Sequence, residues 1–263
     1  MPVDTYTEQA RTRVRAEREA VDEKLDAYEA FIRRVRDLQT EQTPSSVAGL
    51  TTTAGAAHRS ADASGTDRCR TVRTAFDETV RPHSVADIDE TESLLDTIRE
   101  EFRDALAVAL APTTEASFTL ELKRTVLTEA RSRRSEAAAV QKALGREESQ
   151  LDDAAGVVDD VTDWIADANE TPLTDLGFDA LKRRHRRLAD HRDRCEDVVR
   201  DRQAFLGRTT NNGVDAGVRH RGLVPYLYQT FPVDHPVLAT VATLDATCRA
   251  CQRSVRDSLV RRA

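Results

Sequence analysis

The 263-residue chain contains few aromatic residues, few glycines and almost no lysine. Aromatic residues make up 5% of the sequence, and there are 10 glycines, 1 methionine and 1 tryptophan. A compact enzyme core ordinarily holds more aromatic side chains and more turn glycines, so this composition argues against an enzyme. Charged residues instead reach 32% and hydrophobic residues 39%, a balance that is typical of long helices exposed to solvent.

Long apolar runs are also missing. No stretch approaches the roughly 18 consecutive apolar residues of a transmembrane helix, so we expect no membrane contact. Residues 1–4 do not begin a basic segment followed by an apolar run, so we expect no signal peptide. The sequence therefore predicts a soluble, cytoplasmic protein.

Only four of the 39 basic residues are lysines, at positions 24, 123, 142 and 182, and the other 35 are arginines. Aspartate and glutamate number 46, which gives a net charge of −7 and a pI near 5.5. Arginine in place of lysine, together with abundant aspartate, is typical of proteins from salt-loving organisms. At 1 M salt the Debye length falls to about 3 Å, so helix packing rather than long-range charge would stabilise such a protein.

A seven-residue repeat of apolar residues runs from about 123 to 168. Its two rows extend beyond the three or four heptads that distinguish a coiled coil from an ordinary surface helix. The rows are Ala130, Ala137, Leu144, Leu151, Val158 and Ile165, and Val126, Val140, Ala154, Val161 and Ala168. Arg133 and Glu147 occupy second-row positions where apolar residues belong. They either fix the register of a helix pair or mark a seam left exposed beyond the end of its partner helix.

Helical patterns cover most of the remaining chain, and none of it alternates as a strand would. We therefore expect an all-α protein, an antiparallel helical bundle with a long coiled-coil hairpin. A long N-terminal helix would occupy residues 1–42, and a flexible linker rich in Ser, Thr, Ala and Gly would cover 43–66. Residues 67–263 would form the bundle, which includes the hairpin at about 119–207 and a C-terminal helix.

Several residues predict where these helices begin and end. Thr119 is expected to cap the first helix of the hairpin, and the short break at 170–172 would make its two helices antiparallel neighbours. Asp87 with Glu90 resembles a capping box at the start of a single helix that ends before Pro112. Asp234 is expected to cap the last helix, with Pro236 in its first turn.

Short motifs spread over residues 4–263 resemble a known family. They are RCRTVR at 68–73 with RPHS at 81–84, LGF at 176–178 leading to RH at 184–185, and YLY at 226–228 followed by HPVLAT at 235–240. On these motifs the chain is similar to an uncharacterised, all-helical family of haloarchaeal proteins, a domain of unknown function. The resemblance implies a salt-adapted cytoplasmic protein and transfers no catalytic or binding residue.

The strongest candidate for a metal site is a set of cysteines and one histidine. His191 precedes Cys195 by four residues on one expected helix, and Cys248 precedes Cys251 by three on another. Each pair shares a helical face, so two facing helices could offer a Cys₃His tetrahedron to zinc. Both cysteines of the second pair also lie where the apolar stripe needs small residues, and free cysteine is a common buried residue. We favour this second interpretation, in which the cysteines are buried residues of the apolar stripe. Disulfides are not expected in a cytosolic chain.

A basic run, Lys-Arg-Arg-His-Arg-Arg at 182–187, is the candidate for nucleic-acid binding. Six consecutive helical residues point in all directions, however, and several aspartates follow on the same helix. The net charge is also negative, and binding through counter-ion release weakens as salt rises. We therefore interpret the run as a solvated helix face and regard nucleic acid as an unlikely partner.

A cluster of aromatic residues, Tyr226, Tyr228 and Phe231, lies between His220 and His235 in a segment interrupted by Pro225. It could form a docking pocket for a ligand or a partner. It could equally be an apolar plug that fills one end of the bundle, and this second interpretation is favoured.

The sequence indicates a structural or protein-interaction role, as a scaffold or regulator, without catalysis and without cofactors. The partner would be another protein or a second copy, bound through helical seams. We expect an exposed stretch near 123–150 to be the first place to look for it. A zinc-stabilised regulatory bundle and a DNA-associated protein remain as alternatives.

Overall fold

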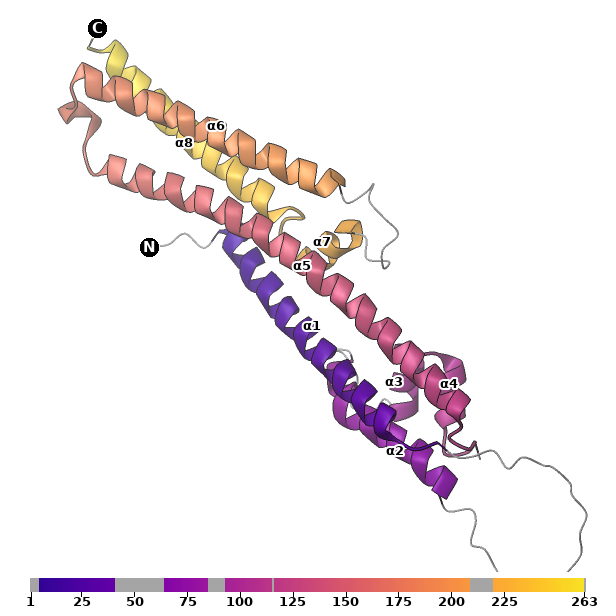
Figure 1. The fold of residues 1–263 in the computed structure, drawn as a ribbon. Helices are drawn as coiled ribbons and strands as arrows, with labels where there is room; N and C mark the ends of the chain where they lie inside the picture. The colour runs from indigo at the N-terminus through magenta and orange to yellow at the C-terminus, as the bar shows by residue number, and fades with distance from the viewer. Residues whose placement is uncertain (1–4, 41–63, 85–92, 115, 209–219, 263) are drawn as a thin grey trace, which may run out of the picture. The chain divides into compact units, whose positions relative to one another are not determined.

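The computed structural model describes residues 5–40, 64–84, 93–114, 116–208 and 220–262 (Figure 1). Within these residues the chain forms α-helices and no strand, which confirms the all-α class. The helices are α1 (Tyr6–Asp37), α2 (Ser64–Thr79), α3 (Leu94–Glu101), α4 (Asp104–Leu110), α5 (Leu120–Asn169), α6 (Phe178–Arg208), α7 (His220–Tyr228) and α8 (Pro236–Val260). Two short 3₁₀ helices lie at Arg81–His83 and Leu173–Asp175. No helix in this part of the chain has both the length and the apolarity needed to cross a bilayer.

Helix starts follow side-chain capping in several places. The Thr119 hydroxyl accepts the backbone N–H of Leu122 at 3.2 Å, as expected, and Ser93 caps α3 in the same way through Asp96. Asp87 and Glu90, the expected capping box, lie outside the described residues. The prediction that Asp234 caps α8 was wrong. His235 occupies the N-cap position, and its side chain makes no capping hydrogen bond.

The single helix expected before Pro112 is two helices. The chain breaks between α3 and α4 at Phe102 and Arg103, and Arg103 is fully extended. The break turns Phe102 into the apolar core, where only 1% of the residue is exposed.

The chain divides into two compact units. Unit 1 contains residues 1–18 and 141–263, and unit 2 contains residues 19–140. These limits differ from the expected division at 42 and 67, because α1 and α5 each contribute residues to both units. Most of the expected linker at 43–66 lies outside the described residues.

Three phenylalanines form the centre of unit 2. Phe76 packs edge-on against Phe31 and Phe102, with ring centroids 5.9 and 5.3 Å away. Arg133, the first polar residue in the heptad row, donates from its guanidinium to the backbone carbonyls of Glu100 and Glu101. Arg133 therefore satisfies carbonyls at the end of α3 that no intrahelical N–H can reach.

Unit 1 is built on α5, α6 and α8, with the first turns of α1 and with α7. The closest helix pair is α6 with α8, which lie side by side (Figure 1). The expected hairpin partner, α5, meets α6 through longer side chains, such as Arg194 of α6 with Asp160 of α5 at 2.7 Å. The coiled-coil character of residues 119–207 stays a prediction.

The heptad rows of α5 are buried in two separate stretches, near 126–130 and from 144 to 161, whereas Ile165 and Ala168 near the end of the helix are half-buried. Val126 and Ala130 are buried in unit 2, and Leu144 and Leu151 are buried in unit 1. No residue from 131 to 142 is buried. The exposed stretch expected near 123–150 is therefore not continuous: buried residues lie on both sides of 131–142, and within 131–142 the row residues Ala137 and Val140 are half-buried.

Candidate functional site

A buried ion pair between α5 and α6 is the most tightly organised polar group in unit 1. The Arg202 guanidinium donates to both carboxylate oxygens of Glu147, at 2.6 and 2.9 Å. The Tyr228 hydroxyl, from α7, donates to the same carboxylate at 2.6 Å. Glu147 is 0% exposed and Arg202 is 3% exposed, so these groups are satisfied by each other and not by water.

Hydrogen bonds to a buried charge hold this cluster together. Burial, followed by the charge of Glu147, raises the pKa of Tyr228 above its usual value, so the phenol stays protonated and keeps donating. A bidentate arginine–carboxylate pair fixes both partners in direction as well as distance. The cluster therefore joins α5, α6 and α7 through three buried side chains. The burial of Glu147 argues against the second role considered for it, an exposed seam.

The cysteine candidates lie in unit 1, where Cys248 has the thiols of Cys195 and Cys251 as neighbours. Cys195 and Cys248 are buried and Cys251 is half-buried. Burial and then the neighbouring thiols of Cys195 and Cys251 raise the pKa of Cys248 to about 11, which keeps it protonated near neutral pH. Among the described residues no three His, Cys, Asp or Glu side chains are placed to hold a metal ion. The zinc set stays a prediction, which metal analysis of the native protein would decide.

His191 itself faces an aromatic ring. It is 1% exposed, and its ring lies 4.8 Å from that of Trp164, centroid to centroid. Neither ring nitrogen has a hydrogen-bond partner in the described part of the chain. Burial, reinforced by Arg187 and Arg194, lowers the pKa of His191 below 6.5, and the nearby Asp190 and Asp160 offset this only in part.

We expect unit 1 to lose stability as the pH falls below about 6.5, because of His191. The unfolded chain takes up a proton on this imidazole near pH 6.5, whereas the folded protein does so only at lower pH. Between these values the unfolded state binds more protons, so the free energy of unfolding decreases with decreasing pH. Urea unfolding followed by circular dichroism between pH 7.5 and 5 measures this slope. His191→Phe should flatten it and His185→Gln should not; an unchanged slope in His191→Phe would refute the assignment.

The basic run at 182–187 spreads around α6. Lys182, Arg183, Arg186 and Arg187 are exposed, whereas Arg184 and His185 are half-buried. The Arg184 guanidinium donates to the Thr171 carbonyl at 3.3 Å, and the His185 carbonyl accepts from Gln252 at 3.4 Å. Part of the run therefore binds the protein itself, and its four exposed cations lie within about 140° of one another on α6.

The aromatic cluster divides between core and surface. Tyr228 is buried and packs against Phe231, with ring centroids 5.3 Å apart, whereas Tyr226 is 48% exposed. The Tyr226 hydroxyl donates to Glu17 of α1 at 3.2 Å. Of the flanking histidines, His235 is exposed, and the side chain of His220 lies outside the described residues.

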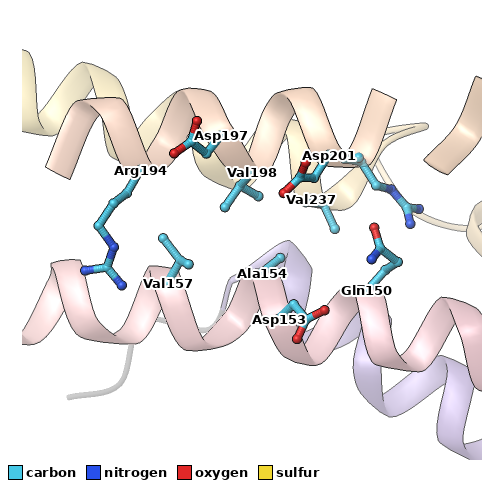
Figure 2. A pocket seen from close by; sticks show the side chains of 10 residues that line it. Gln150, Asp153, Ala154, Val157, Arg194, Asp197, Val198, Asp201 and Val237 are labelled. Carbon is cyan, nitrogen blue, oxygen red and sulfur yellow. The ribbon is translucent and has the colours of Figure 1, made fainter. Parts of the chain in front are cut away.

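A cavity of about 350 Å³ opens between α5 and α6 (Figure 2). Its lining includes the acidic residues Asp153 from α5 and Asp197 and Asp201 from α6, together with the apolar Ala154 of α5 and Val237 of α8. Its two arginines are already ion-paired, Arg194 with Asp160 and Arg202 with Glu147. Sequence reasoning missed this cavity, because its acidic residues come from two helices and show no common spacing.

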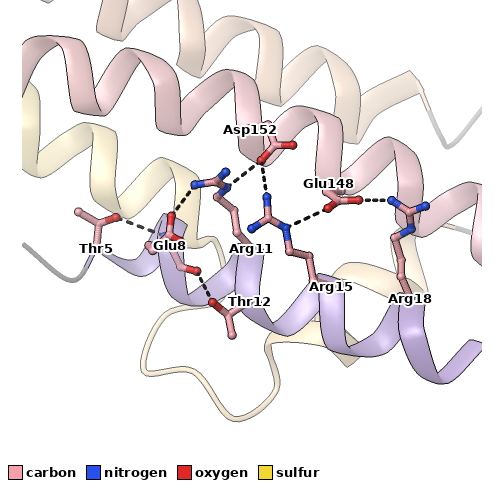
Figure 3. Close-up of polar contacts among 8 residues, drawn as sticks. All are labelled: Thr5, Glu8, Arg11, Thr12, Arg15, Arg18, Glu148 and Asp152. Carbon is pink, nitrogen blue, oxygen red and sulfur yellow. Dashed lines mark hydrogen bonds and ion pairs between the residues drawn. The ribbon is translucent and has the colours of Figure 1, made fainter. Parts of the chain in front are cut away.

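A ladder of ion pairs joins the start of α1 to α5 (Figure 3). The Arg11 Nε lies 2.8 Å from Asp152, and the Arg15 Nε lies 3.1 Å from Glu148. Arg18 completes the ladder by pairing with Glu148. Burial acts to raise the pKa of Glu148, but the hydrogen bonds from Arg18 and Arg15 outweigh it and lower the pKa below its usual value.

An apolar groove continues from the end of this ladder, between α5 and α8. Its volume is about 520 Å³, and its lining includes Thr5 and the first residue of α1, Tyr6. We call it the α5–α8 groove; its walls are Val158, Thr162 and Ile165 of α5 and Thr240, Thr243, Leu244 and Thr247 of α8. No lining residue is charged, in a chain in which 32% of residues are charged.

A second cavity, of about 350 Å³, adjoins the α5–α8 groove and shares Ile165 with it. It lies further along α5 and α8, against Ala168 of α5 and Cys251 of α8, and α6 also lines it through Arg184 and Leu188. From Val158 to Asn169 the two cavities follow about 17 Å of helix, or three turns. The heptad pattern of α5 predicted an inward face here but could not show that part of it would stay uncovered.

Comparison with known proteins gives one result. A model of a protein family described as a domain of unknown function (DUF7260) matches residues 5–252. No curated protein and no solved structure matches the chain. The match covers all eight helices, apart from the last residues of α8. The chain therefore belongs to this family, a domain of unknown function.

Proposed function

We propose that the protein is a non-catalytic interaction scaffold whose α5–α8 groove binds a helix of a partner protein. The observation that carries the proposal is the uncharged, apolar lining of a groove that follows about two turns of α5, from Val158 to Ile165. Exposed apolar surface of this kind is typical of protein-binding sites, and an amphipathic helix is the usual occupant of such a groove.

The first turns of α1 support a helix as the occupant. Thr7, Ala10 and Val14 of α1 are all fully buried, and the ladder of arginines holds this part of α1 on α5. Because Thr5 and Tyr6 line part of the α5–α8 groove, a docked helix would extend the packing that α1 already makes.

The composition supports two further parts of the proposal. Arginine in place of lysine and the excess of acidic residues favour a haloarchaeal origin and a cytoplasmic location. At high salt, apolar packing strengthens while surface charge is screened, so a charge-free groove would suit recognition in that environment.

A photo-crosslinking amino acid placed at Thr247 tests the proposal in cells that naturally make the protein. We expect crosslinks to one helical segment of another protein, mapped by mass spectrometry, and none from Arg253, an exposed position elsewhere on α8. The double variant Thr243→Gln/Thr162→Gln fills the groove with longer uncharged side chains and should abolish the product. Crosslinks at the level of Arg253, or only to a second copy of the chain, would refute the proposal.

A further inference from the structure

The contacts between α1 and α5 indicate what kind of helix the surface of α5 can bind. The arginines of α1 meet Glu148 and Asp152, two carboxylates four residues apart on one edge of α5. Arg11 pairs near the start of α1 and Arg18 further along, so the two helices run antiparallel. Recognition therefore combines a buried apolar stripe with arginines spaced by four and three residues.

The same acidic edge continues beyond the start of α1. Asp159 and Asp163 follow Glu148 by 11 and 15 residues. At 100° per residue, positions 148, 152, 159 and 163 fall within about 60° of one another on the helix. Asp159 and Asp163 therefore extend the edge that α1 uses, again with a spacing of four residues.

These two aspartates are the sequence neighbours of residues that line the α5–α8 groove. Asp159 follows Val158 and Asp163 follows Thr162, and both lining residues face the groove. Both aspartates are exposed, and within the described residues neither forms an ion pair. In contrast, Glu148 and Asp152 each pair with two arginines.

We infer that the helix bound in the α5–α8 groove carries two arginines four residues apart, which pair with Asp159 and Asp163. The inference rests on the proposed function and adds the chemistry of the partner. The occupant runs antiparallel to α5 and presents a stripe of small apolar residues to the groove. It thus repeats the pattern by which Ala10, Arg11, Val14 and Arg15 attach α1 to α5.

A peptide with the sequence of residues 5–21, labelled and held helical by a lactam on its outer face, is a direct probe. The α1 of the intact protein already occupies its own position, so the peptide is left with the α5–α8 groove. Fluorescence anisotropy should show binding, and Arg11→Gln/Arg15→Gln in the peptide should weaken it about tenfold, as two lost ion pairs do. The Asp159→Lys/Asp163→Lys protein should bind the original peptide at least tenfold more weakly, and less so at 1 M salt.

The controls separate this inference from the proposed function. Asp153→Lys/Asp197→Lys makes the same change in net charge at the cavity of Figure 2 and should leave peptide binding unchanged. Equal affinities for the arginine and glutamine peptides, or no binding of either, would overturn the inference. Binding that Thr243→Gln/Thr162→Gln abolishes but Asp159→Lys/Asp163→Lys leaves intact would overturn the arginine pairing while supporting the groove. The crosslinking experiment tests the proposed function without reference to charge.

Discussion

Replacing Arg202 by leucine is expected to lower the free energy of unfolding of unit 1 by about 3–5 kcal/mol. The substitution leaves the Glu147 carboxylate fully buried with only the Tyr228 hydroxyl as a donor. An uncompensated buried charge costs more than the pair itself contributes, which is why removal of one partner is so damaging. Trp164 is the only tryptophan and lies in unit 1, so its fluorescence during chemical denaturation reports on this unit.

Two further variants show whether the loss arises from the unpaired charge. Glu147→Leu/Arg202→Leu/Tyr228→Phe removes all three polar groups and should recover most of the lost stability, because an apolar replacement of a buried ion pair is often close to neutral. Arg200→Leu, on the exposed face of the same helix, should change stability by no more than about 0.5 kcal/mol. A loss in the triple variant as large as in Arg202→Leu would show that shape rather than charge is limiting.

Phe76→Ala is expected to destabilise unit 2 by about 3–5 kcal/mol. Phe76 is 1% exposed, and its ring contacts both other phenylalanines of the cluster. Truncation to alanine therefore leaves a cavity that the rings of Phe31 and Phe102 do not fill. Hydrogen exchange of the amides of α2, α3 and α4 measures the loss locally.

Val108→Ala is the control for this prediction. Val108 lies in the same unit but is 51% exposed, so its truncation should change amide protection by no more than about 0.5 kcal/mol. If Phe76→Ala and Val108→Ala gave equal effects, the phenylalanine cluster would not be the centre of the core.

The sequence predicted the helices well because their signal is local. Apolar residues recur at 3.6-residue spacing, and threonine and proline mark starts within a residue or two, as at Thr119 and Pro236. The break at Phe102 had no such mark, since neither glycine nor proline occurs there. The break accompanies the burial of Phe102 against other helices. Such tertiary packing produces no periodic pattern in the sequence of a single segment.

Of the two residues of the buried ion pair, only one could be predicted from the sequence. Glu147 stood out as a polar residue in an apolar row, but its partner lies 55 residues away among many charges. A signal did exist, because Arg202 follows Leu181, Leu188 and Cys195 at intervals of seven. Opposite charges at inward positions of two antiparallel helices predict a pair. The Arg133 contacts had no comparable signal, because they reach backbone carbonyls rather than a side chain.

The threonines of α8 give the α5–α8 groove both polar hydroxyl groups and apolar methyl groups. The Thr243 hydroxyl donates to the Ala239 carbonyl and the Thr247 hydroxyl to the Thr243 carbonyl, at 3.0 and 2.9 Å. With the hydroxyls held against their own backbone, the methyl groups are left for an incoming helix. Leucines at these positions would make the unoccupied groove more strongly apolar and prone to permanent association. Threonines keep it wettable between encounters, so the attachment we expect is rapid and reversible.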